Sequence, residues 1–204
     1  MRRAKPGGGG RLWWLLPLGV ALLGTVAAAR RGADLEHRMR DLEDRLAARS
    51  GELNLTRIHL RRLAAILGHS TDHDIPADLA TAIYDIALAE GIDPSLAFSL
   101  VAVESRFASR AISTAGAVGL TQVMPSTARW LQPGLGDSDL FERETNLRLG
   151  FRYLKRMLEQ YDGDLHLALL AYNRGPARVD SIRTRGGDPS NGYPEAVLAE
   201  SPSR

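Results

Sequence analysis

The chain has 204 residues, of which 44% are hydrophobic, and a formal net charge of +2. This length and composition suit one globular domain with accessory segments. Residues 1–33 carry six basic side chains and no acidic one, whereas residues 34–204 carry 20 basic and 24 acidic ones. A nucleic-acid-binding domain needs basic charge on its folded surface, so we expect no nucleic acid as partner. The absence of cysteine excludes disulfides, thiolate metal sites and lipid attachment to cysteine.

An uncharged, mostly apolar run of 18 residues, 12–29, follows the basic N-terminus at residues 1–11. As a helix it would span about 27 Å, close to the ~30 Å of a bilayer core. Trp13 and Trp14 stand at its start, where an interfacial aromatic belt would lie. We predict a single-pass anchor in the inner membrane, with residues 1–11 cytoplasmic and the rest periplasmic. The alternative is a signal peptide cleaved after the alanines at 27–29, which would release the protein.

Residues 34–67 carry a stripe of apolar side chains that alternates steps of four and three. Its members are Leu35, Met39, Leu42, Leu46, Leu53, Leu60, Leu63 and Leu67. Arg49 and Thr56 interrupt the stripe but keep its register. This heptad pattern predicts a coiled-coil-like helical stalk through which the chain forms a homodimer. The alternative is an amphipathic helix that packs on its own domain.

The polar segment 68–75 is expected to end this helix and serve as a hinge. His69 and His73 have the spacing of two metal ligands on one helical face. Because they fall in a breaker segment, we expect solvated loop histidines and no metal site.

Helical patterns follow one another through residues 76–199, and no run alternates with a period of two over a length that would favour a strand. The expected helices are 77–90, 94–107, 126–131, 146–161, 165–172, 177–184 and 193–200. Gly91 is expected to end the first of them, and Asp93 to cap the second. The fold class is therefore predicted to be all-α.

The helix at 94–107 is apolar on nearly all sides, which is typical of a buried central helix. Glu104, near its end, is its only acidic residue. Burial there should raise the pKa of the carboxyl group. As an isolated residue, Glu104 would more readily be read as an exposed helix end paired with Arg106 or Arg110.

The motifs around Glu104 change that interpretation. Glu104-Ser105 is followed by Gly-Ala-Val-Gly-Leu-Thr-Gln-Val-Met-Pro at 116–125 and by Ala-Tyr-Asn at 171–173. In this order and spacing they resemble the soluble-type lytic transglycosylases, which have a lysozyme-like, goose-type helical fold. The resemblance covers about residues 76–199, the predicted catalytic domain.

The resemblance implies that Glu104 is the single catalytic acid and base. The residues that it implies at the substrate are Ser105, Gly119, Leu120, Gln122, Tyr153, Tyr172, Asn173 and Tyr193, with Gly116 in the same motif. Tyr172 is expected to reach toward Glu104, and Asn173 toward an acetamido group of the substrate. Two residues depart from the family pattern: Thr121 replaces a methionine and Arg174 replaces an alanine, and both are expected to alter the groove.

The implied reaction cleaves the β-1,4 bond between N-acetylmuramic acid and N-acetylglucosamine in peptidoglycan. Ordinary glycosidases use two carboxylates, but no second acid accompanies Glu104 in the motifs. The acetamido group and the C6 hydroxyl of the sugar would assist, giving 1,6-anhydromuramic ends without a metal or cofactor. Two alternatives remain: a muramidase that hydrolyses the same bond, and a membrane-anchored scaffold that binds peptidoglycan without cleaving it.

Overall fold

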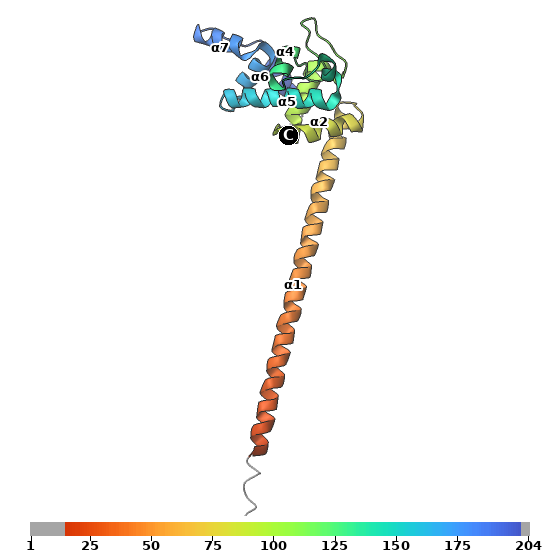
Figure 1. Ribbon diagram of the computed structural model, residues 1–204, viewed down its shortest axis with the longest axis vertical. Helices are drawn as coiled ribbons and strands as arrows, with labels where there is room; N and C mark the ends of the chain where they lie inside the picture. The colour runs from red at the N-terminus through yellow and green to blue at the C-terminus, as the bar shows by residue number, and fades with distance from the viewer. Residues whose placement is uncertain (1–14, 201–204) are drawn as a thin grey trace, which may run out of the picture. The chain divides into compact units, whose positions relative to one another are not determined.

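The computed structural model describes residues 15–200 (Figure 1). Two units divide the chain, residues 1–61 and 62–204, and each is considered by itself. The described residues form helices, turns and loops, with no strand among them. Isolated β-bridges join Val118 to Ile112 and to Val123. The predicted all-α class is therefore confirmed.

The described part of the first unit consists of residues 15–61 of helix α1 (Leu15–Asp72). The side chains of the heptad stripe are exposed along it; Leu46, for example, is 69% exposed. Within residues 15–200, no helix has a stretch long and apolar enough to cross a bilayer. The predicted membrane segment 12–29 begins outside the described residues, and the basic segment 1–11 lies wholly outside them.

The end of α1 differs from the prediction, because the helix continues to Asp72 through the expected hinge at 68–75. In the second unit, its last turns pack on α3 (Pro94–Ser105). Ile66 is buried, and the ring of His69 stacks on Phe98 with centroids 4.0 Å apart. These contacts outweigh the low helix propensity of Gly68.

The prediction of solvated loop histidines is therefore wrong. His69 lies in the last turn of α1 and His73 directly after it, both partly buried. The ring of His73 packs against Phe107, with centroids 5.0 Å apart.

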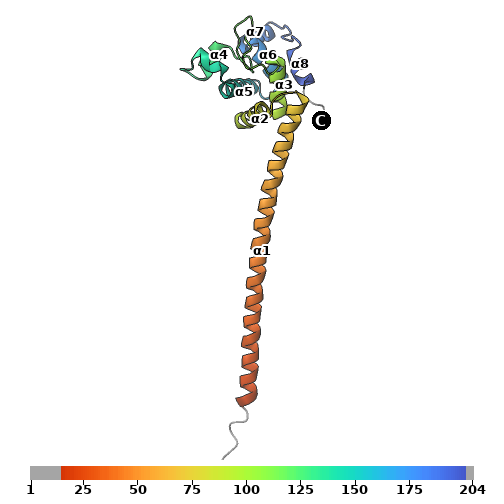
Figure 2. The same cartoon turned by 90° about the vertical axis from the view of Figure 1, so that its right-hand side faces the viewer.

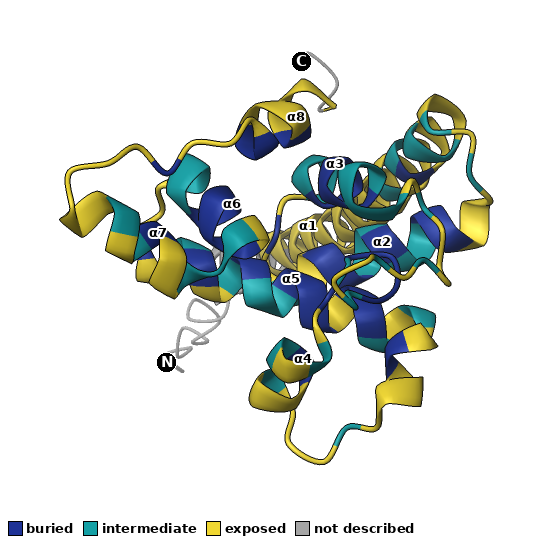
Figure 3. Ribbon diagram, turned by 90° about the horizontal axis from the view of Figure 1, so that it is seen from above, coloured by how far each residue is buried: buried dark blue, intermediate teal, exposed yellow. Residues whose placement is uncertain are grey.

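Short helices make up the rest of the second unit (Figures 1 and 2). Besides α3 and the last turns of α1, it contains α2 (Ala77–Glu90), α4 (Pro125–Leu131), the 3-10 helix η1 (Asp137–Phe141), α5 (Arg143–Gln160), α6 (Leu165–Arg174), α7 (Pro176–Thr184) and α8 (Tyr193–Ala199). Helix α5 packs against α2, α4, α6 and η1, and α3 packs against α2 and α8. Figure 3 shows the buried faces of α2, α3, α5 and α6 turned toward the interior.

Local chemistry explains most helix ends. Gly91 ends α2 with φ 74°, as predicted. Helix α3 stops at Ser105, earlier than predicted, because Arg106 and Phe107 adopt left-handed φ values of 50° and 62°. Helix α4 begins at Pro125, one residue earlier than predicted, because the fixed φ of proline suits the first helical position.

Candidate active site

Helix α3 carries Glu104 to the end of the hydrophobic core. The Asp93 side chain accepts hydrogen bonds from the backbone N–H groups of Ser95 (2.9 Å) and Leu96 (3.2 Å), which fixes the start of the helix. Along its length, Phe98 and Leu100 are fully buried. The sequence of the helix therefore places one carboxyl group in its last turn, at the edge of an apolar core.

The environment of Glu104 favours its neutral form. Burial raises the pKa of the carboxyl group to about 7, although a hydrogen bond from Tyr193 acts in the opposite direction. In that bond the Tyr193 hydroxyl donates to Oε1 of Glu104. A carboxyl group with a pKa near 7 can both donate and accept a proton at neutral pH.

A cavity of about 230 Å³ is lined in part by Tyr172, whose hydroxyl group is close enough to feel the charge of Glu104. Its walls come from the loop before α4 and from α4, α5 and α6: Gln122, Val123, Met124, Thr127, Tyr153, Tyr172, Asn173, Arg174 and Gly175. Glu104 does not line the cavity itself. Burial raises the pKa of the Tyr172 phenol, and the charge of Glu104, which lies close to it, raises this pKa further.

Gln122 is held in the cavity wall by the loop that carries it. Its side-chain nitrogen donates to the backbone oxygens of Gly119 (2.9 Å) and Ala111 (3.3 Å). The amide oxygen makes no hydrogen bond to any described residue, so it can accept one from a ligand. Gln122 itself has φ 49°, a left-handed value that is uncommon for a residue other than glycine.

Thr121 has a different role from the one predicted. Its side chain is fully buried and does not line the cavity. The hydroxyl group donates to Oδ1 (2.8 Å) and the backbone oxygen (3.0 Å) of Asn146 on α5. The departure from the family pattern at this position therefore changes the support of the groove and leaves its surface unchanged.

Asn146 joins residues 116–124, the glycine loop, to α5 through both polar atoms of its side chain. Its amide nitrogen donates to the backbone oxygens of Val118 and Leu140, both at 2.9 Å, and its oxygen accepts from the Thr121 N–H group at 2.9 Å. Gly119 is needed here, because a Cβ atom on it would lie 2.2 Å from the Asn146 amide nitrogen. The loop thus approaches α5 closely, which fixes the position of Gln122.

Tyr172 was expected to reach toward Glu104, but its hydroxyl donates to the backbone oxygen of Thr121 at 2.8 Å. Tyr193 makes the direct bond to Glu104. The ring of Tyr172 packs against Tyr153, with centroids 5.2 Å apart. The two tyrosines form a continuous aromatic wall of the cavity.

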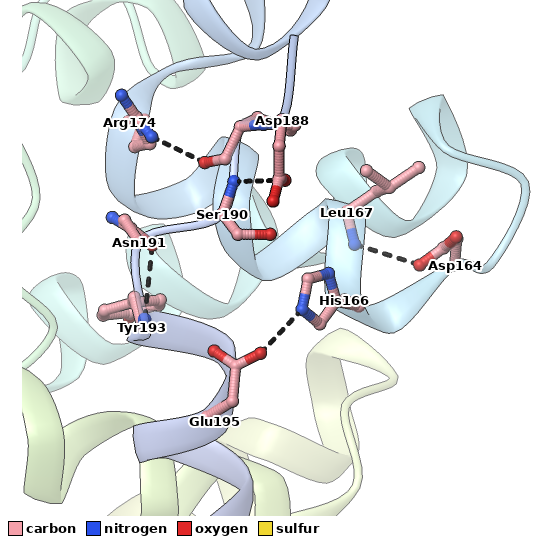
Figure 4. Close-up of polar contacts among 10 residues, drawn as sticks. Asp164, His166, Leu167, Arg174, Asp188, Ser190, Asn191, Tyr193 and Glu195 are labelled. Atoms are coloured by element: carbon pink, nitrogen blue, oxygen red, sulfur yellow. Dashed lines mark hydrogen bonds and ion pairs between the residues drawn. The ribbon is translucent and has the colours of Figure 1, made fainter. Parts of the chain in front are cut away.

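A chain of hydrogen bonds that the sequence did not reveal connects Asn173 to Tyr193. Asn191 donates through Nδ2 to Oδ1 of Asn173 at 2.8 Å. The Oδ1 atom of Asn191 accepts from the Tyr193 N–H group at 3.2 Å (Figure 4). Arg174, in the same region, donates to the backbone oxygen of Pro189 at 2.6 Å. Asn191 lies in a loop outside the motifs, so no sequence signal marked it.

Of the residues implied at the substrate, Ser105, Gly119, Leu120 and Tyr193 lie outside the cavity lining, as does Gly116. Leu120 is fully buried in the core, and Gly119 packs on Asn146. The Ser105 hydroxyl donates to the backbone oxygen of Val101 at 3.2 Å, within its own helix. The structure therefore brings Gln122, Tyr153, Tyr172 and Asn173 together in the cavity, with Tyr193 at Glu104.

The acidic residues that follow the glycine loop are engaged elsewhere. Asp137 pairs with Arg129 at 2.7 Å, and Asp139 accepts from the Gly136 N–H group at 2.9 Å. Within residues 15–200, no cluster of three or more histidine or acidic side chains could hold a metal ion. The candidate site is thus a single carboxyl group beside a cavity with polar and aromatic walls.

Comparison with known proteins identifies this arrangement. The family model of the transglycosylase SLT domain matches residues 81–191, more than half of the chain. The chain belongs to this family. The matched SLT domain includes Glu104, the glycine loop and the cavity wall on α6, while Tyr193 lies just beyond it.

Individual relatives agree with this assignment. The soluble lytic murein transglycosylase of Salmonella typhimurium is 35% identical over 94 residues, which cover 43% of this chain and 15% of the relative. The transglycosylase of Enterobacteria phage PRD1 is 34% identical over 107 residues, 52% of this chain and 37% of the relative. Among solved structures, an inactive glutamate-to-glutamine mutant of the lytic transglycosylase Slt from Pseudomonas aeruginosa aligns with a TM-score of 0.51. The two sequences are 31% identical, and the alignment covers 59% of this chain and 22% of the Pseudomonas chain.

These matches confirm the lysozyme-like helical fold expected for the SLT domain. The chain spans well under half the length of each of these three relatives.

Proposed function

We propose that this protein is a peptidoglycan lytic transglycosylase in which Glu104 is the single general acid and base. The observation that carries the proposal is a carboxyl group with a pKa raised to about 7, next to a cavity lined by Gln122, Tyr172 and Asn173. A general acid is most effective when its pKa lies near the working pH. Relatives named lytic transglycosylases support the reaction class. So does the Pseudomonas mutant, in which a glutamate-to-glutamine change accompanies inactivity.

The proposed reaction begins with protonated Glu104, which gives its proton to the glycosidic oxygen as the bond from C1 of N-acetylmuramic acid breaks. The 2-acetamido oxygen of the same sugar stabilises the positive charge that develops at C1. The Glu104 carboxylate then removes the proton of the C6 hydroxyl, and O6 forms the new bond to C1. Glu104 ends in its starting protonation state, the product is a 1,6-anhydro sugar, and no water is consumed.

The other residues of the cavity would orient the sugar during this reaction. The free amide oxygen of Gln122 can accept from a substrate hydroxyl or N–H group, and Asn173 can bind the acetamido group. Tyr153 and Tyr172 offer an aromatic wall on which a sugar ring can pack. Ser105, Gly119 and Leu120 would act indirectly, by supporting Glu104 and the loop.

The test of this function is digestion of purified sacculi by the full-length protein, with soluble muropeptides as the readout. The proposal expects release that depends on the protein and needs no added metal. Binding to sacculi without release would instead favour the non-catalytic scaffold.

Substitution of Tyr193 with phenylalanine should move the pH profile of this release. In the wild-type protein, the hydrogen bond from the Tyr193 hydroxyl lowers the pKa of Glu104. Phenylalanine cannot make this bond, so the pKa of Glu104 should rise above about 7. Because protonated Glu104 starts the reaction, the alkaline fall in rate should shift to higher pH, while the maximal rate declines.

Tyr161→Phe is the matched control. It also removes a tyrosine hydroxyl that donates to a carboxylate, but that carboxylate belongs to Asp180 and not to Glu104, so the pH profile should not move. An alkaline limb that stays in place in Tyr193→Phe, or moves to lower pH, would contradict the assigned role of Tyr193.

We further propose that residues 12–29 anchor the protein in the inner membrane and leave residues 76–199 as a catalytic domain in the periplasm. The basis is the apolar run behind a basic N-terminus. Cell fractionation with sequencing of the mature N-terminus tests this. A soluble product that begins near Arg30 would show that residues 12–29 are a cleaved signal peptide and not an anchor.

A parallel homodimer through residues 34–67 is proposed from the exposed heptad stripe of α1. Charges beside the stripe fit this arrangement: Arg38 and Glu43, and likewise Glu52 and Arg57, are five residues apart and of opposite sign. At this spacing, the first residue of one helix meets the second residue of its partner in a parallel coiled coil.

Because the chain has no cysteine, Leu53→Cys in the stripe should give a disulfide-linked dimer of the full-length protein on oxidation. Asn54→Cys, one position off the stripe, should cross-link much less. If the two variants cross-link equally, or if neither cross-links at micromolar protein concentration, the proposed dimer is wrong and residues 34–67 serve only as a spacer.

A further inference from the structure

Asn191 joins Asn173, on α6, to the start of α8. The side chain of Asn191 donates through Nδ2 to Oδ1 of Asn173 at 2.8 Å and accepts at Oδ1 from the Tyr193 N–H group at 3.2 Å. Both polar atoms of the Asn191 amide are therefore engaged. Asn191 lies outside the motifs, and the reaction proposed above does not use it.

The amide relay formed by the Tyr193 N–H group, Asn191 and Asn173 has a fixed direction. A backbone N–H group can only donate, so the atom of Asn191 that faces it must be the amide oxygen. The other atom of that amide is then the nitrogen, which also can only donate, so Asn173 must turn its oxygen toward Asn191. The amide nitrogen of Asn173 makes no hydrogen bond to any residue in the range 15–200, and Asn173 lines the cavity.

The loop that carries Asn191 is held on both sides of this residue. Before it, Arg174 donates to the backbone oxygen of the buried Pro189 at 2.6 Å. After it, Tyr193 is buried and begins α8 (Figure 4). The relay thus starts from a backbone group whose position is fixed by packing.

We propose that Asn191 is a positioning residue that keeps the amide nitrogen of Asn173 turned toward the cavity, where it donates to an acetamido oxygen of the glycan. This proposal rests on the proposed function, which makes an N-acetylated glycan the substrate.

The polarity of the cavity wall fits such a substrate. Gln122 presents the opposite polarity to that of Asn173, since its amide nitrogen is engaged and its oxygen is not. A donor and an acceptor that both face the cavity match the C=O and N–H groups of acetamido substituents. An amide oxygen has two lone pairs, so accepting from Asn173 leaves one that can approach C1.

The relay controls how many molecules present the donor. Without it, the two orientations of the Asn173 amide would be about equally populated. One ordinary hydrogen bond biases this balance about fivefold, so about 80% of wild-type molecules present the nitrogen. The apparent dissociation constant of a ligand is inversely proportional to the binding-competent fraction.

Two substitutions in the full-length protein separate the relay from simple support of the loop. Asn191→Ala removes both bonds, so about half of the molecules stay competent and the KM for glycan strands should rise about 1.5- to 2-fold. In Asn191→Asp, one carboxylate oxygen still accepts from the Tyr193 N–H group, but the other cannot donate. Asn173 must then donate to it and turn its own oxygen toward the cavity. Because hydrogen bonds to carboxylates are stronger, the competent fraction should fall to about 10% and KM should rise about eightfold, with kcat little changed.

A purely structural role predicts the opposite order, because alanine removes more contacts than aspartate. The proposal is overturned if KM rises at least as much in Asn191→Ala as in Asn191→Asp, or if Asn191→Asp keeps the wild-type KM. The difference should persist at 1 M salt, where the Debye length of about 3 Å screens the added charge. If it disappears there, charge alone explains it and the proposal is wrong. Ser190→Ala is the matched control: it changes the exposed neighbour of Asn191, leaves the relay intact and should keep KM within about twofold.

A binding experiment separates this proposal from the proposed function. The β-1,4-linked tetramer of N-acetylglucosamine carries acetamido groups but no muramic acid. Calorimetry should show that its dissociation constant rises about eightfold in Asn191→Asp and at most about twofold in Asn191→Ala. Cellotetraose, which has hydroxyl groups in place of the acetamido groups, should not distinguish the variants from the wild-type protein.

If tetramer binding follows this order but sacculi are not cleaved, the positioning role of Asn191 stands and the transglycosylase reaction does not. An equal loss on both sugars would overturn the positioning role, whatever the cleavage activity. So would the absence of tetramer binding to the wild-type protein at millimolar concentration.

Discussion

Replacement of Glu104 with glutamine is expected to abolish muropeptide release from sacculi, with a fall of at least about 10²–10⁴-fold. Glutamine keeps the size of the side chain and can still accept the hydrogen bond from Tyr193. It cannot donate a proton to the glycosidic oxygen or take one from the C6 hydroxyl. Asp137 and Asp139, which follow the glycine loop in the sequence, are held in other contacts, so we expect neither to replace it.

Two variants of the cavity wall are the controls for this result. Gln122→Ala and Tyr172→Phe should weaken the positioning of substrate but leave measurable turnover. Binding of the Glu104→Gln protein to sacculi should persist. Release near the wild-type rate in Glu104→Gln would show that Glu104 is not the acid.

Thermal melts of the same variant also report on the carboxyl group. Burial raises the pKa of Glu104 from 4.5 to about 7 in the folded state. The contribution of this group to the free energy of unfolding is therefore fully present below pH 4.5 and is lost as the pH rises through 7. The wild-type protein should therefore lose up to about 3 kcal/mol between pH 5 and pH 9 through this group. Glu104→Gln should lack this loss and melt higher than wild type at pH 9.

The largest effect on stability is expected from Asn146→Ala. This change leaves two buried groups without a partner, the backbone oxygen of Leu140 and the N–H group of Thr121. It also removes one of the two hydrogen bonds to the backbone oxygen of Val118, which keeps the bond from the Val123 N–H group. At about 1–3 kcal/mol for each unpaired group, we expect a loss of about 2–6 kcal/mol in the free energy of unfolding. The melting temperature should fall by about 5 °C or more. Denaturation monitored by circular dichroism measures both quantities.

Glu144→Gln, an exposed change on the same helix, should alter the free energy of unfolding little. Release from sacculi should fall in Asn146→Ala even below its melting temperature, because the loop that holds Gln122 loses its attachment to α5. A loss under 1 kcal/mol would mean that the glycine loop is held mainly by other contacts.

The sequence predicted what local chemistry controls. The apolar character of α3, with Asp93 at its start, predicted both the helix and the burial of Glu104, and Gly91 correctly marked the end of α2. The prediction failed where tertiary contacts decide. Helix α1 passes through Gly68 because its last turns, including His69, pack on α3, and no local pattern carries that information.

The candidate site shows the same division. The motifs located Gln122, Tyr172 and Asn173, which the structure brings into one cavity. The motifs did not reveal which tyrosine bonds Glu104, because that depends on how α8 packs against α3. Likewise, Thr121 turns into the core because Gly150 leaves room for it: a Cβ atom on Gly150 would lie 2.3 Å from the Thr121 Cβ atom.

The mass of the muropeptides that the wild-type protein releases from sacculi is the most direct test of the central claim. If Glu104 moves the C6 proton and O6 closes on C1, the products carry 1,6-anhydromuramic ends and have gained no water. Products heavier by one water for each bond cleaved would show that water attacks C1 and that the protein is a hydrolytic muramidase.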